Sequence, residues 1–442
     1  MNRIEFSKSL LGKIINKYKN FEYYRNNAGK FFAMQYLSKK QIEEYQVEQL
    51  KKILQSAVDT VPYYRYLKSE INFSNFSKKE LHKFPIVTKE IMRENIDMFL
   101  SDRFVSKGKW SNTSGSTGNV FEFMIGENSD VIEAIFKYRG WGMGRTYNYK
   151  KKDPVLMLRS YAPNSNGDLT KVDKVNNYWY MSAFDINQKN LSVYLKFIKK
   201  SESKILRGYP SSIYIFTLLL EKNNIKLKQI ETIVTSSETL LPLWRDKIEK
   251  YWGIPVLDRY GQNERSVVLH QCWAGNYHND DEYGIVEIGN NNEIIATSLF
   301  NFSMPFIRYN TGDLAIPLDQ SVDKCPCGRN LYIPLKGIRG RADDILVKGD
   351  GTRVPTINIY TIMHEISKLE QFKIVQKVNM DLEIFAVCVD RDRLVENQII
   401  EALRQRVGNL KMKVIFTDNI ERDKKTGKVK VIESFVDKER IL

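Results

Sequence analysis

The sequence predicts an α/β protein with a large N-terminal domain of mixed sheets and helices and a small C-terminal α+β domain. The chain has 442 residues, which is more than one hydrophobic core usually serves. Short apolar runs alternate with amphipathic stretches between about residues 105 and 335, as strands and helices do in α/β folds. A charged, glycine-punctuated segment at 337–344 interrupts this alternation. We therefore expect domains of residues 1–340 and 341–442.

The individual elements follow from local periodicity. Apolar residues recur at spacings of three and four on both sides of the break at Val61-Pro62, which predicts helix over residues 42–66. The same spacing predicts helices over 132–141, 210–222 and 395–408. Apolar runs bounded by Gly, Pro and Asn predict strands at 154–158, 205–206, 232–234, 256–258, 285–288, 343–347, 373–378 and 380–389. Asp350-Gly351 is typical of a tight hairpin turn.

Composition excludes several functional classes. Apolar residues make up 42% and charged residues 27%, as in ordinary globular proteins. No apolar run approaches the roughly 18 residues that a membrane helix needs, and the N-terminus has no signal-peptide layout, so we expect a cytoplasmic protein without membrane insertion. The formal net charge is +15, but the lysines are spread along the chain without an arginine-rich stripe. A solvated basic surface explains this charge, and we expect no nucleic-acid partner.

A run of hydroxyls and glycines lies between two apolar segments. It consists of Thr113, Ser114, Gly115, Ser116, Thr117 and Gly118. Glycines let backbone N–H groups face inward and hydroxyls add donors, so such a run can bind a polyphosphate. No Gly-Lys-Ser/Thr follows, which excludes a Walker A loop. Taken alone, such a run is more often a solvated loop.

The cysteines suggest a metal site. The chain has four, too few for a disulfide scaffold of this length. Cys272, His278, Cys325 and Cys327 offer three sulfurs and one imidazole, a set that suits tetrahedral Zn²⁺. Two separate pairs of buried groups are the alternative, and His270 is a competing ligand. Cys388 lies in an apolar strand pattern and is expected in the core.

Five further motifs follow the hydroxyl-rich run. They are Thr235-Ser-Ser-Glu238, Asp258-Arg-Tyr-Gly-Gln-Asn-Glu264, Ile307-Arg-Tyr-Asn-Thr-Gly-Asp313, Gly340-Arg-Ala-Asp-Asp344 and Lys424-Lys-Thr-Gly-Lys428. In this order the chain resembles the ANL adenylate-forming superfamily. Ala57-Val-Asp-Thr-Val-Pro-Tyr-Tyr-Arg65, Phe84-Pro-Ile-Val-Thr-Lys89 and Met304-Pro-Phe-Ile-Arg-Tyr309 resemble the phenylacetate–CoA ligase family, and within it the capsular-polysaccharide-biosynthesis (CapK-type) proteins. The likeness covers about residues 45–432.

The resemblance implies a nucleotide site. ATP or AMP would be bound by Thr113, Ser114, Gly115, Ser116, Thr117, Gly118, Ser237, Glu238, Tyr260, Gly261 and Asp313, with Tyr260 on adenine and Asp313 on the ribose hydroxyls. Glu264 would hold Mg²⁺, since a hard cation prefers carboxylate and phosphate oxygens. Arg341 matches a ribose- or phosphate-contacting arginine, with Arg339 as its competitor.

The resemblance also implies a catalytic lysine and a hinge. Thr426-Gly427 selects Lys428 as that lysine among Lys424, Lys425 and Lys430, although the cluster alone would be a solvated basic turn. Asp343 matches the hinge of a mobile small domain. Several members of this branch carry a similar Cys/His zinc site, which would be structural here. The acyl pocket would lie between the helix after Arg207-Gly-Tyr-Pro-Ser211, residues 236–238 and residues 138–141.

The expected function is ATP-dependent activation of a small carboxylic acid as acyl-AMP, with pyrophosphate released and the acyl group then transferred. Two departures from the family leave the acceptor open. Asn119 follows the last glycine of the loop where many acyl-CoA synthetases carry lysine. Residues 348–353 replace a stretch that shapes the pantetheine tunnel in phenylacetate–CoA ligases. We expect an amine, a hydroxyl or a carrier protein as the acceptor, in surface-polysaccharide biosynthesis; the alternative is an acyl- or aryl-CoA ligase.

Overall fold

The computed structural model describes residues 10–113, 121–146, 149–159, 168–184, 186–318, 324–329, 335–341, 345–350, 353–355, 359, 362–363, 365–366, 368–421 and 429–436. The chain forms two compact units, Met1–Lys151 with Leu257–Ile338 and Lys152–Val256 with Arg339–Leu442. These units divide the chain differently from the predicted domains of residues 1–340 and 341–442, which stay a prediction. None of the described helices is long and apolar enough to cross a bilayer.

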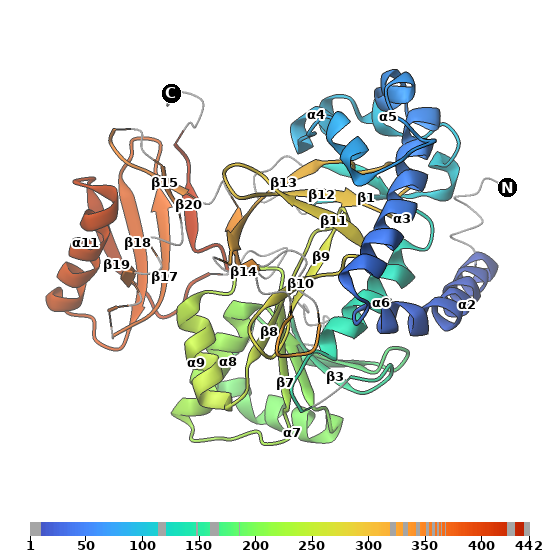
Figure 1. Ribbon diagram of the computed structural model, residues 1–442. Coiled ribbons are helices and arrows are strands. Elements are labelled where there is room, and N and C mark those ends of the chain that lie inside the picture. Colours follow the sequence, from blue (N-terminus) through green and yellow to red (C-terminus); the bar gives the residue numbers. More distant parts are fainter. Residues whose placement is uncertain are drawn as a thin grey trace. The chain divides into compact units, whose positions relative to one another are not determined.

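The first unit contains the N-terminal helices and a mostly antiparallel sheet (Figure 1). Its helices are α2 Leu10–Met34, α3 Lys39–Thr60, α4 Lys89–Glu94, α5 Ile96–Phe99 and α6 Ser129–Trp141, with 3₁₀ turns at Pro62–Ser69, Lys78–Lys83 and Val105–Lys107. The sheet runs in the order β11 Gly284–Ile288, β12 Glu293–Ser298, β13 Tyr309–Pro317, β14 Leu335–Arg341, β10 Tyr277–Asn279, β9 Val268–Gln271 and β8 Val256–Gly261. β1 Lys109–Asn112 and β2 Glu122–Ile125 form a separate hairpin.

The second unit contains a parallel sheet and a smaller mixed sheet. The parallel strands are β7 Thr232–Ser236, β6 Ile205–Gly208, β3 Val155–Arg159 and β5 Tyr178–Ser182, and β4 Thr170–Asp173 adds an antiparallel edge. The helices are α7 Leu191–Ser201, α8 Pro210–Lys222 and α9 Pro242–Trp252, with a 3₁₀ turn at Gln188–Asn190. The smaller sheet runs β19 Met412–Phe416, β18 Leu382–Cys388, β17 Leu369–Gln376 and β20 Ile432–Ser434. β15 Ile345–Val347 and β16 Arg353–Pro355 form a separate hairpin, and α11 Arg393–Val407 completes the unit.

Local signals explain where these helices begin and end. Ser38 accepts a hydrogen bond from the Gln41 backbone, and the Gln41 side chain accepts one from the Ser38 backbone, so a capping box starts α3. Pro62 then ends α3, because proline cannot continue the hydrogen-bond pattern, and the chain continues as a 3₁₀ turn. α8 and α9 each begin with proline, whose missing N–H is not needed at that position.

The predicted α/β class is confirmed, and most predicted elements are present with shifted ends. The helix predicted over 42–66 is α3 followed by a 3₁₀ turn. β15 and β16 form a hairpin in which Val347 pairs with Arg353. Gly351 lies outside the described residues, so the tight turn at Asp350-Gly351 stays a prediction. Cys388 is buried in β18, as expected.

Candidate active site and metal centre

The two strands that flank the predicted phosphate loop are closed against each other. Asn112 of β1 pairs with Glu122 of β2. One residue further in, the Thr113 N–H donates to the Phe121 carbonyl at 3.0 Å, and the Phe121 N–H donates to Thr113 Oγ1 at 3.3 Å. Thr113 is therefore buried at the base of the hairpin. Ser114, Gly115, Ser116, Thr117 and Gly118 lie outside the described residues, so only the base of this loop is described.

The Tyr-Gly-Gln-Asn-Glu motif lies beside that base. Asn263 Nδ2 donates to the Asn112 carbonyl at 3.2 Å, which holds residue 264 near the end of β1. The Glu264 side chain is buried and accepts a hydrogen bond from the Tyr309 hydroxyl at 3.0 Å. Burial, reinforced by the charge of Glu264, raises the pKa of Tyr309 well above its usual value, so the hydroxyl keeps its proton and remains a donor.

A second tyrosine–carboxylate pair joins β8 to β13. The Tyr260 hydroxyl donates to Asp313 Oδ2 at 2.8 Å. Burial is the largest cause, and the charge of Asp313 the next, of a Tyr260 pKa well above its usual value. Gly312 has a φ of +74°, and the Asp313 N–H donates to Thr311 Oγ1 at 3.2 Å, so the backbone before Asp313 is held in a turn that favours glycine.

The start of β13 is fixed by a segment far away in sequence. The Val87 N–H donates to the Arg308 carbonyl at 3.1 Å, and the Asn310 N–H donates to the Val87 carbonyl at 2.8 Å. Arg308 has a φ of +47°, which is uncommon for a residue other than glycine. Its guanidinium pairs with Glu287 at 3.1 Å and donates to the Phe84 carbonyl at 3.0 Å. The motifs at 84–89 and 304–309, which are far apart in the sequence, therefore position Tyr309 together.

Within the second unit, Glu238 connects α8 to the segment that follows Lys428. One carboxylate oxygen accepts from the Ser211 N–H at 3.1 Å, in the first turn of α8. The other accepts from the Val429 N–H at 2.9 Å. Ser237 precedes it with a φ of +74°, a strained conformation for serine. Lys428, the predicted hinge Asp343 and the rival lysines Lys424 and Lys425 lie outside the described residues.

The remaining predicted residues are described only partly. Arg339 and Arg341 both belong to β14, but the side chain of Arg341 is not among those described. Gly261 ends β8, directly after Tyr260. Tyr138 and Trp141, expected at the acyl pocket, are buried in the first unit with their rings packed on Tyr149, at centroid distances of 5.4 and 5.0 Å.

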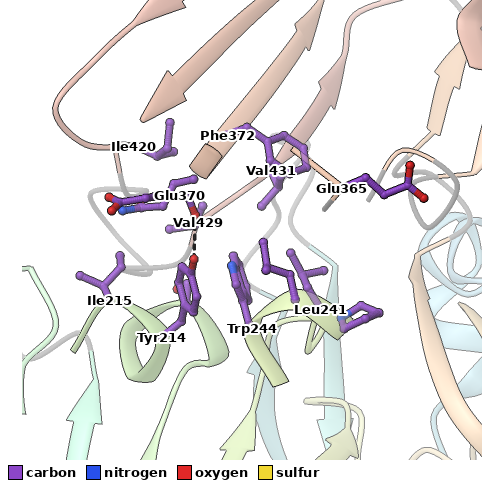
Figure 2. A pocket seen from close by; sticks show the side chains of 14 residues that line it. Tyr214, Ile215, Leu241, Trp244, Glu365, Glu370, Phe372, Ile420, Val429 and Val431 are labelled. Atoms are coloured by element: carbon purple, nitrogen blue, oxygen red, sulfur yellow. Dashed lines mark hydrogen bonds between the residues drawn. The ribbon is translucent and has the colours of Figure 1, made fainter. Parts of the chain in front are cut away.

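An apolar pocket of about 350 Å³ lies in the second unit (Figure 2). Tyr214 of α8 and Trp244 of α9 project into it with their rings stacked at 5.7 Å between centroids. The Tyr214 hydroxyl donates to the Glu370 carbonyl at 2.9 Å, and Phe372 of β17 and Val429 line the opposite wall. This pocket extends from Ser211 in the first turn of α8, the helix predicted to border the acyl site.

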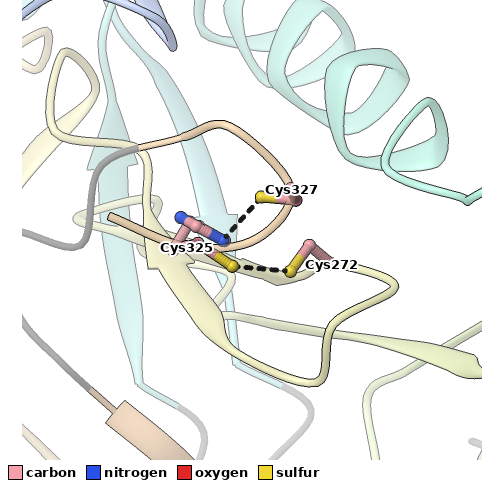
Figure 3. Close-up of side chains that lie close together, drawn as sticks. Cys272, Cys325 and Cys327 are labelled. Carbon is pink, nitrogen blue, oxygen red and sulfur yellow. Dashed lines mark hydrogen bonds between the residues drawn. The ribbon is translucent and has the colours of Figure 1, made fainter. Parts of the chain in front are cut away.

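The four predicted metal ligands come together. The ligand atoms of Cys272, His278, Cys325 and Cys327 all lie within 4.8 Å of one another. Cys272 Sγ is 3.5 Å from Cys325 Sγ, and Cys327 Sγ is 3.4 Å from His278 Nε2 (Figure 3). Ligands about 2.0–2.3 Å from a tetrahedral zinc ion are about 3.5–3.8 Å apart, so the donor set fits the metal in both chemistry and spacing.

Two tight turns present the sulfurs. The Gly275 N–H donates to the Cys272 carbonyl and the Gly328 N–H to the Cys325 carbonyl, each at 2.9 Å. Gly275 and Gly328 have φ values of +84° and +85°, which both turns require and which glycine adopts without strain. The hydrogen bond between Cys272 and Cys327 lowers the pKa of Cys327 and raises that of Cys272, because the two thiols compete for one proton.

His270, the competing ligand, belongs elsewhere. It pairs in register with His278 across β9 and β10, but its Nδ1 lies 3.1 Å from Asp280 Oδ2. Burial lowers the pKa of His270, partly offset by Asp280, whose other oxygen binds Arg139. Among the described residues the ligand cluster is therefore the predicted set of four.

Sequence reasoning missed two side chains of this site. Tyr309 lies in the motif at 307–313 and Asn263 in the motif at 258–264, but the sequence analysis assigned a role to neither. The constant spacing of Tyr309 from Asp313 within one motif is the sequence signal that could have identified Tyr309. No signal in the sequence pairs Asn263 with the Asn112 carbonyl, because that contact joins backbone and side chain across about 150 residues.

Comparisons with known proteins give the fold. No family model matches the chain. It is 24% identical to Protein CapK of Staphylococcus aureus over 368 residues, which cover 77% of this chain and 79% of CapK. It superposes with a TM-score of 0.67 and 17% identity on 2-hydroxyisobutyryl-CoA ligase in the postadenylation state with R3-HIB-AMP, covering 92% of each chain. An ATP-bound chimera of RpMatB and BxBclM superposes with a TM-score of 0.51 and 16% identity, over 72% of this chain and 66% of that one. The resemblance to CapK-type proteins expected from the motifs is thus confirmed, and the solved structures share the fold.

Proposed function

We propose that this chain, whose fold is that of the adenylate-forming acyl-CoA ligases, activates a carboxylic acid with ATP and passes the acyl group to an acceptor. The observation that carries the proposal is the pairing of Tyr309 with Glu264 and of Tyr260 with Asp313. Asn263, between these two motif ends, is bonded to the base of the hairpin that carries Thr113. A polar constellation of this kind suits a nucleotide and its metal ion.

The residues take the following roles. Asp313, an ionised acceptor held by Tyr260, binds the ribose hydroxyls, and Tyr260 and Gly261 border the adenine. Glu264 would hold Mg²⁺, which would supply positive charge to offset that of the phosphates. Glu264 suits this role because its carboxylate is buried with acceptor positions beyond the one that Tyr309 uses. Thr113, Ser114, Gly115, Ser116, Thr117 and Gly118 bind the phosphates.

The reaction needs positioning and charge stabilisation rather than covalent help from the protein. A carboxylate oxygen of the acid attacks the α-phosphorus of ATP, and the bond to pyrophosphate breaks. By the family resemblance, Lys428 would stabilise the negative charge of the transition state, Arg341 would contact the nucleotide and Asp343 would be the hinge. Glu238 accepts a hydrogen bond from the N–H of Val429, the residue that follows Lys428.

The acceptor then attacks the acyl carbonyl, and AMP leaves. The likeness to CapK favours an acceptor in surface-polysaccharide biosynthesis, such as an amine, a hydroxyl or a carrier protein. The structural neighbour named a CoA ligase keeps CoA as the second candidate. Consumption of free CoA during turnover separates the two. The cytoplasmic location inferred from the sequence stays a prediction.

ATP–pyrophosphate exchange tests the activity. We expect exchange with at least one acid of a panel that includes amino acids, aryl acids and hydroxy acids. Lys428→Ala should lose it, whereas Lys430→Ala, two residues further along and paired with Glu433 at 3.7 Å, should keep it. No exchange above background with any acid, in protein that binds ATP, would contradict the proposal.

We infer that the Cys272, His278, Cys325 and Cys327 cluster holds structural zinc. Four protein ligands leave no open position for a substrate, so the ion ties the two turns together and performs no chemistry. Elemental analysis of protein purified without added metal should find about one zinc per chain. A stoichiometric absence would overturn the assignment.

A further inference from the structure

Two arginines flank the segment 260–264, and both pair with helix α6. Arg259 precedes this segment in β8, and Arg265 follows it. The Arg259 guanidinium forms an ion pair with Glu133, and the Arg265 guanidinium forms one with Asp130 at 2.8 Å. The segment that we place at the adenine and the metal ion is therefore joined to one helix at both ends.

The geometry of β8 and α6 explains why these pairs form. Side chains alternate along a strand, so Arg259 lies on the opposite face of β8 from Tyr260. This is the face on which α6 packs, because Val268 of the neighbouring β9 shares it and belongs to the apolar cluster of α6. Asp130 and Glu133 are three residues apart in α6, a spacing that places them side by side on the helix.

The pair at the start of the segment is mostly buried. The side chains of Arg259 and Glu133 are 11% and 22% exposed, and Glu133 also accepts from the Tyr283 hydroxyl at 3.0 Å. Burial raises the pKa of Glu133, but the charges of Arg259 and Arg265 outweigh it and lower the pKa, so the carboxylate stays ionised. Loss of either partner would leave a buried charge unpaired, so this pair also supports the fold.

The pair at the end of the segment reaches the hairpin that carries the phosphate loop. One oxygen of Asp130 accepts from Arg265 Nη2 at 2.8 Å, and the other accepts from Lys109 Nζ of β1 at 2.5 Å. Burial raises the pKa of Asp130, but these two hydrogen bonds outweigh it and lower the pKa. Asn263 is bonded to the other end of β1. The residues on both sides of Glu264 are therefore connected to β1, one directly and one through Asp130.

The position of Glu264 depends on these neighbours. Arg265 has a φ of +56°, a left-handed conformation that a residue other than glycine keeps only when its surroundings hold it. A cavity of about 10 Å³ is bordered by Glu264, Arg265 and Ser298, which leaves space for about one water molecule. Close packing therefore does not by itself fix Glu264 on this side.

We propose that Asp130 and Arg265 are positioning residues of the nucleotide site, which set Glu264 in register with the phosphate loop. This inference rests on the proposed function, since that function assigns the metal ion to Glu264 and the phosphates to residues 113–118. The Asp130 side chain is 52% exposed, and an ion pair this exposed contributes little to stability. A small displacement of a group that holds a reactant is costly, so the pair should act on ligand binding rather than on Tm.

Binding of ATP with Mg²⁺ and of AMP, each measured by calorimetry, tests the proposal. We expect Asp130→Asn to weaken ATP binding in the presence of Mg²⁺ about tenfold and to leave AMP binding and the Tm of the free chain unchanged. The sign is decisive, because removal of a negative charge near a polyphosphate would by itself strengthen binding of that anion. Unchanged or tighter binding of ATP with Mg²⁺ would therefore overturn the proposal. Glu127→Gln, exposed and three residues before Asp130, loses the same charge and should change neither affinity.

Variants of the partner test the pairing itself. Arg265→Lys keeps a charged donor for Asp130 and should keep most of the affinity for ATP with Mg²⁺, whereas Arg265→Gln should lose as much as Asp130→Asn. The double variant should bind no more weakly than either single variant, because both remove the same pair. Losses that add in the double variant would mean that the two residues act separately, against the proposal.

The binding assays also separate this inference from the proposed function. A selective loss of ATP binding in Asp130→Asn, in a chain that shows no exchange with any acid, would leave the positioning role standing and refute the ligase. Exchange in the wild-type chain with an Asp130→Asn variant of unchanged KM for ATP would leave the ligase standing and refute the positioning role.

Discussion

The first unit contains two polar clusters, and they differ in how many of the ligand or hydrogen-bond positions the protein itself fills. Cys272, His278, Cys325 and Cys327 supply four ligand atoms within 4.8 Å, presented by two rigid glycine turns. Glu264 accepts a hydrogen bond from the Tyr309 hydroxyl at 3.0 Å, and Asp313 accepts one from the Tyr260 hydroxyl at 2.8 Å. The Cys/His cluster is complete once it holds an ion, whereas an ionised carboxylate has several acceptor positions, of which a tyrosine uses one.

This is the difference that we expect between a structural site and a catalytic site. A closed coordination sphere contributes folding free energy and leaves no position for a substrate. A carboxylate that is oriented by one donor keeps acceptor positions for a ligand, and its orientation costs nothing at the moment of reaction. The two clusters should therefore respond differently to substitution. Substitution of a carboxylate should lower activity and leave stability unchanged, whereas substitution of a cysteine should lower stability.

Removal of a carboxylate charge should have the largest effect. Glu264→Gln and Asp313→Asn keep size and a hydrogen-bond acceptor for Tyr309 and Tyr260 but lose the negative charge. We expect ATP–pyrophosphate exchange to fall about a hundredfold or more in each, with the Tm changed by no more than a few degrees. Glu44→Gln, exposed on α3, serves as control. A large loss of Tm in either variant would erase the distinction between the two clusters.

Substitution of a cysteine ligand should act through stability. Cys272→Ser and Cys325→Ser should lose bound zinc and lower the Tm by about 5 °C or more, because the two turns lose their crosslink. Cys388→Ala, a buried cysteine in β18 outside the cluster, should keep its zinc. Elemental analysis and thermal melting of the same samples measure both quantities. Zinc-free variants with an unchanged Tm but no exchange would point to a catalytic metal.

The Cys/His cluster was predicted completely from the sequence, and the carboxylate site only in part. Coordination chemistry restricts residue type and number, so four ligands can be recognised by spacing and identity. Glu264 and Asp313 were found through motif order, but their partner Tyr309 was not assigned. Its place depends on the bond between Val87 and Arg308, which joins segments more than 200 residues apart. No local pattern encodes such a contact.

The limits of the strand predictions show a second physical reason. The apolar-run rule ended the predicted strands at Leu158 and Leu206, and the observed β3 and β6 continue through Arg159 and Gly208. Each omitted extension contains an arginine, Arg159 in β3 and Arg207 in β6. A rule that recognises strands by apolarity stops where a charged side chain appears, and such positions are where a buried strand carries function.

Long-range packing was also beyond the sequence. Residues 152–256 form one compact unit with residues 339–442, although they were assigned to different domains. The bond from the Tyr214 hydroxyl to the Glu370 carbonyl spans 156 residues, and both belong to the wall of the apolar pocket. Amphipathic periodicity predicts that α8 buries one face, but it does not identify which element covers it.

Removal of a single tyrosine hydroxyl should have a smaller effect than removal of the carboxylate it holds. Tyr309→Phe and Tyr260→Phe leave Glu264 and Asp313 charged but less well oriented. A hydrogen bond to a charged group contributes about 1.5–3 kcal/mol, so we expect exchange to fall about tenfold to a hundredfold. Tyr36→Phe, an exposed tyrosine, is the matched control. An effect as large as that of Glu264→Gln would mean that orientation, rather than charge, dominates.

Asp281 sharpens the comparison because it is a buried carboxylate outside both clusters. Its Oδ1 accepts from Asn279 Nδ2 at 2.8 Å, and burial raises its pKa to about 7. Between pH 3.8 and about 7, the folded chain therefore keeps a proton on Asp281 that the unfolded chain has lost. The free energy that this proton contributes to folding is fully present below pH 3.8 and is lost as the pH rises through about 7.

Asp281→Asn should remove this pH dependence, which is the smallest effect we predict. The Tm of the variant minus that of the wild-type chain should rise between about pH 4 and pH 7, by about 1 °C per pH unit, and then level off. Asp97→Asn, exposed on α5, should show no such trend. ATP–pyrophosphate exchange should be unaffected at all pH values, because Asp281 lies outside the pairs formed by Glu264 and Asp313. A difference in Tm that falls with rising pH would mean that Asp281 is ionised in the folded state and balanced by Lys78, whose charge lowers the pKa of Asp281.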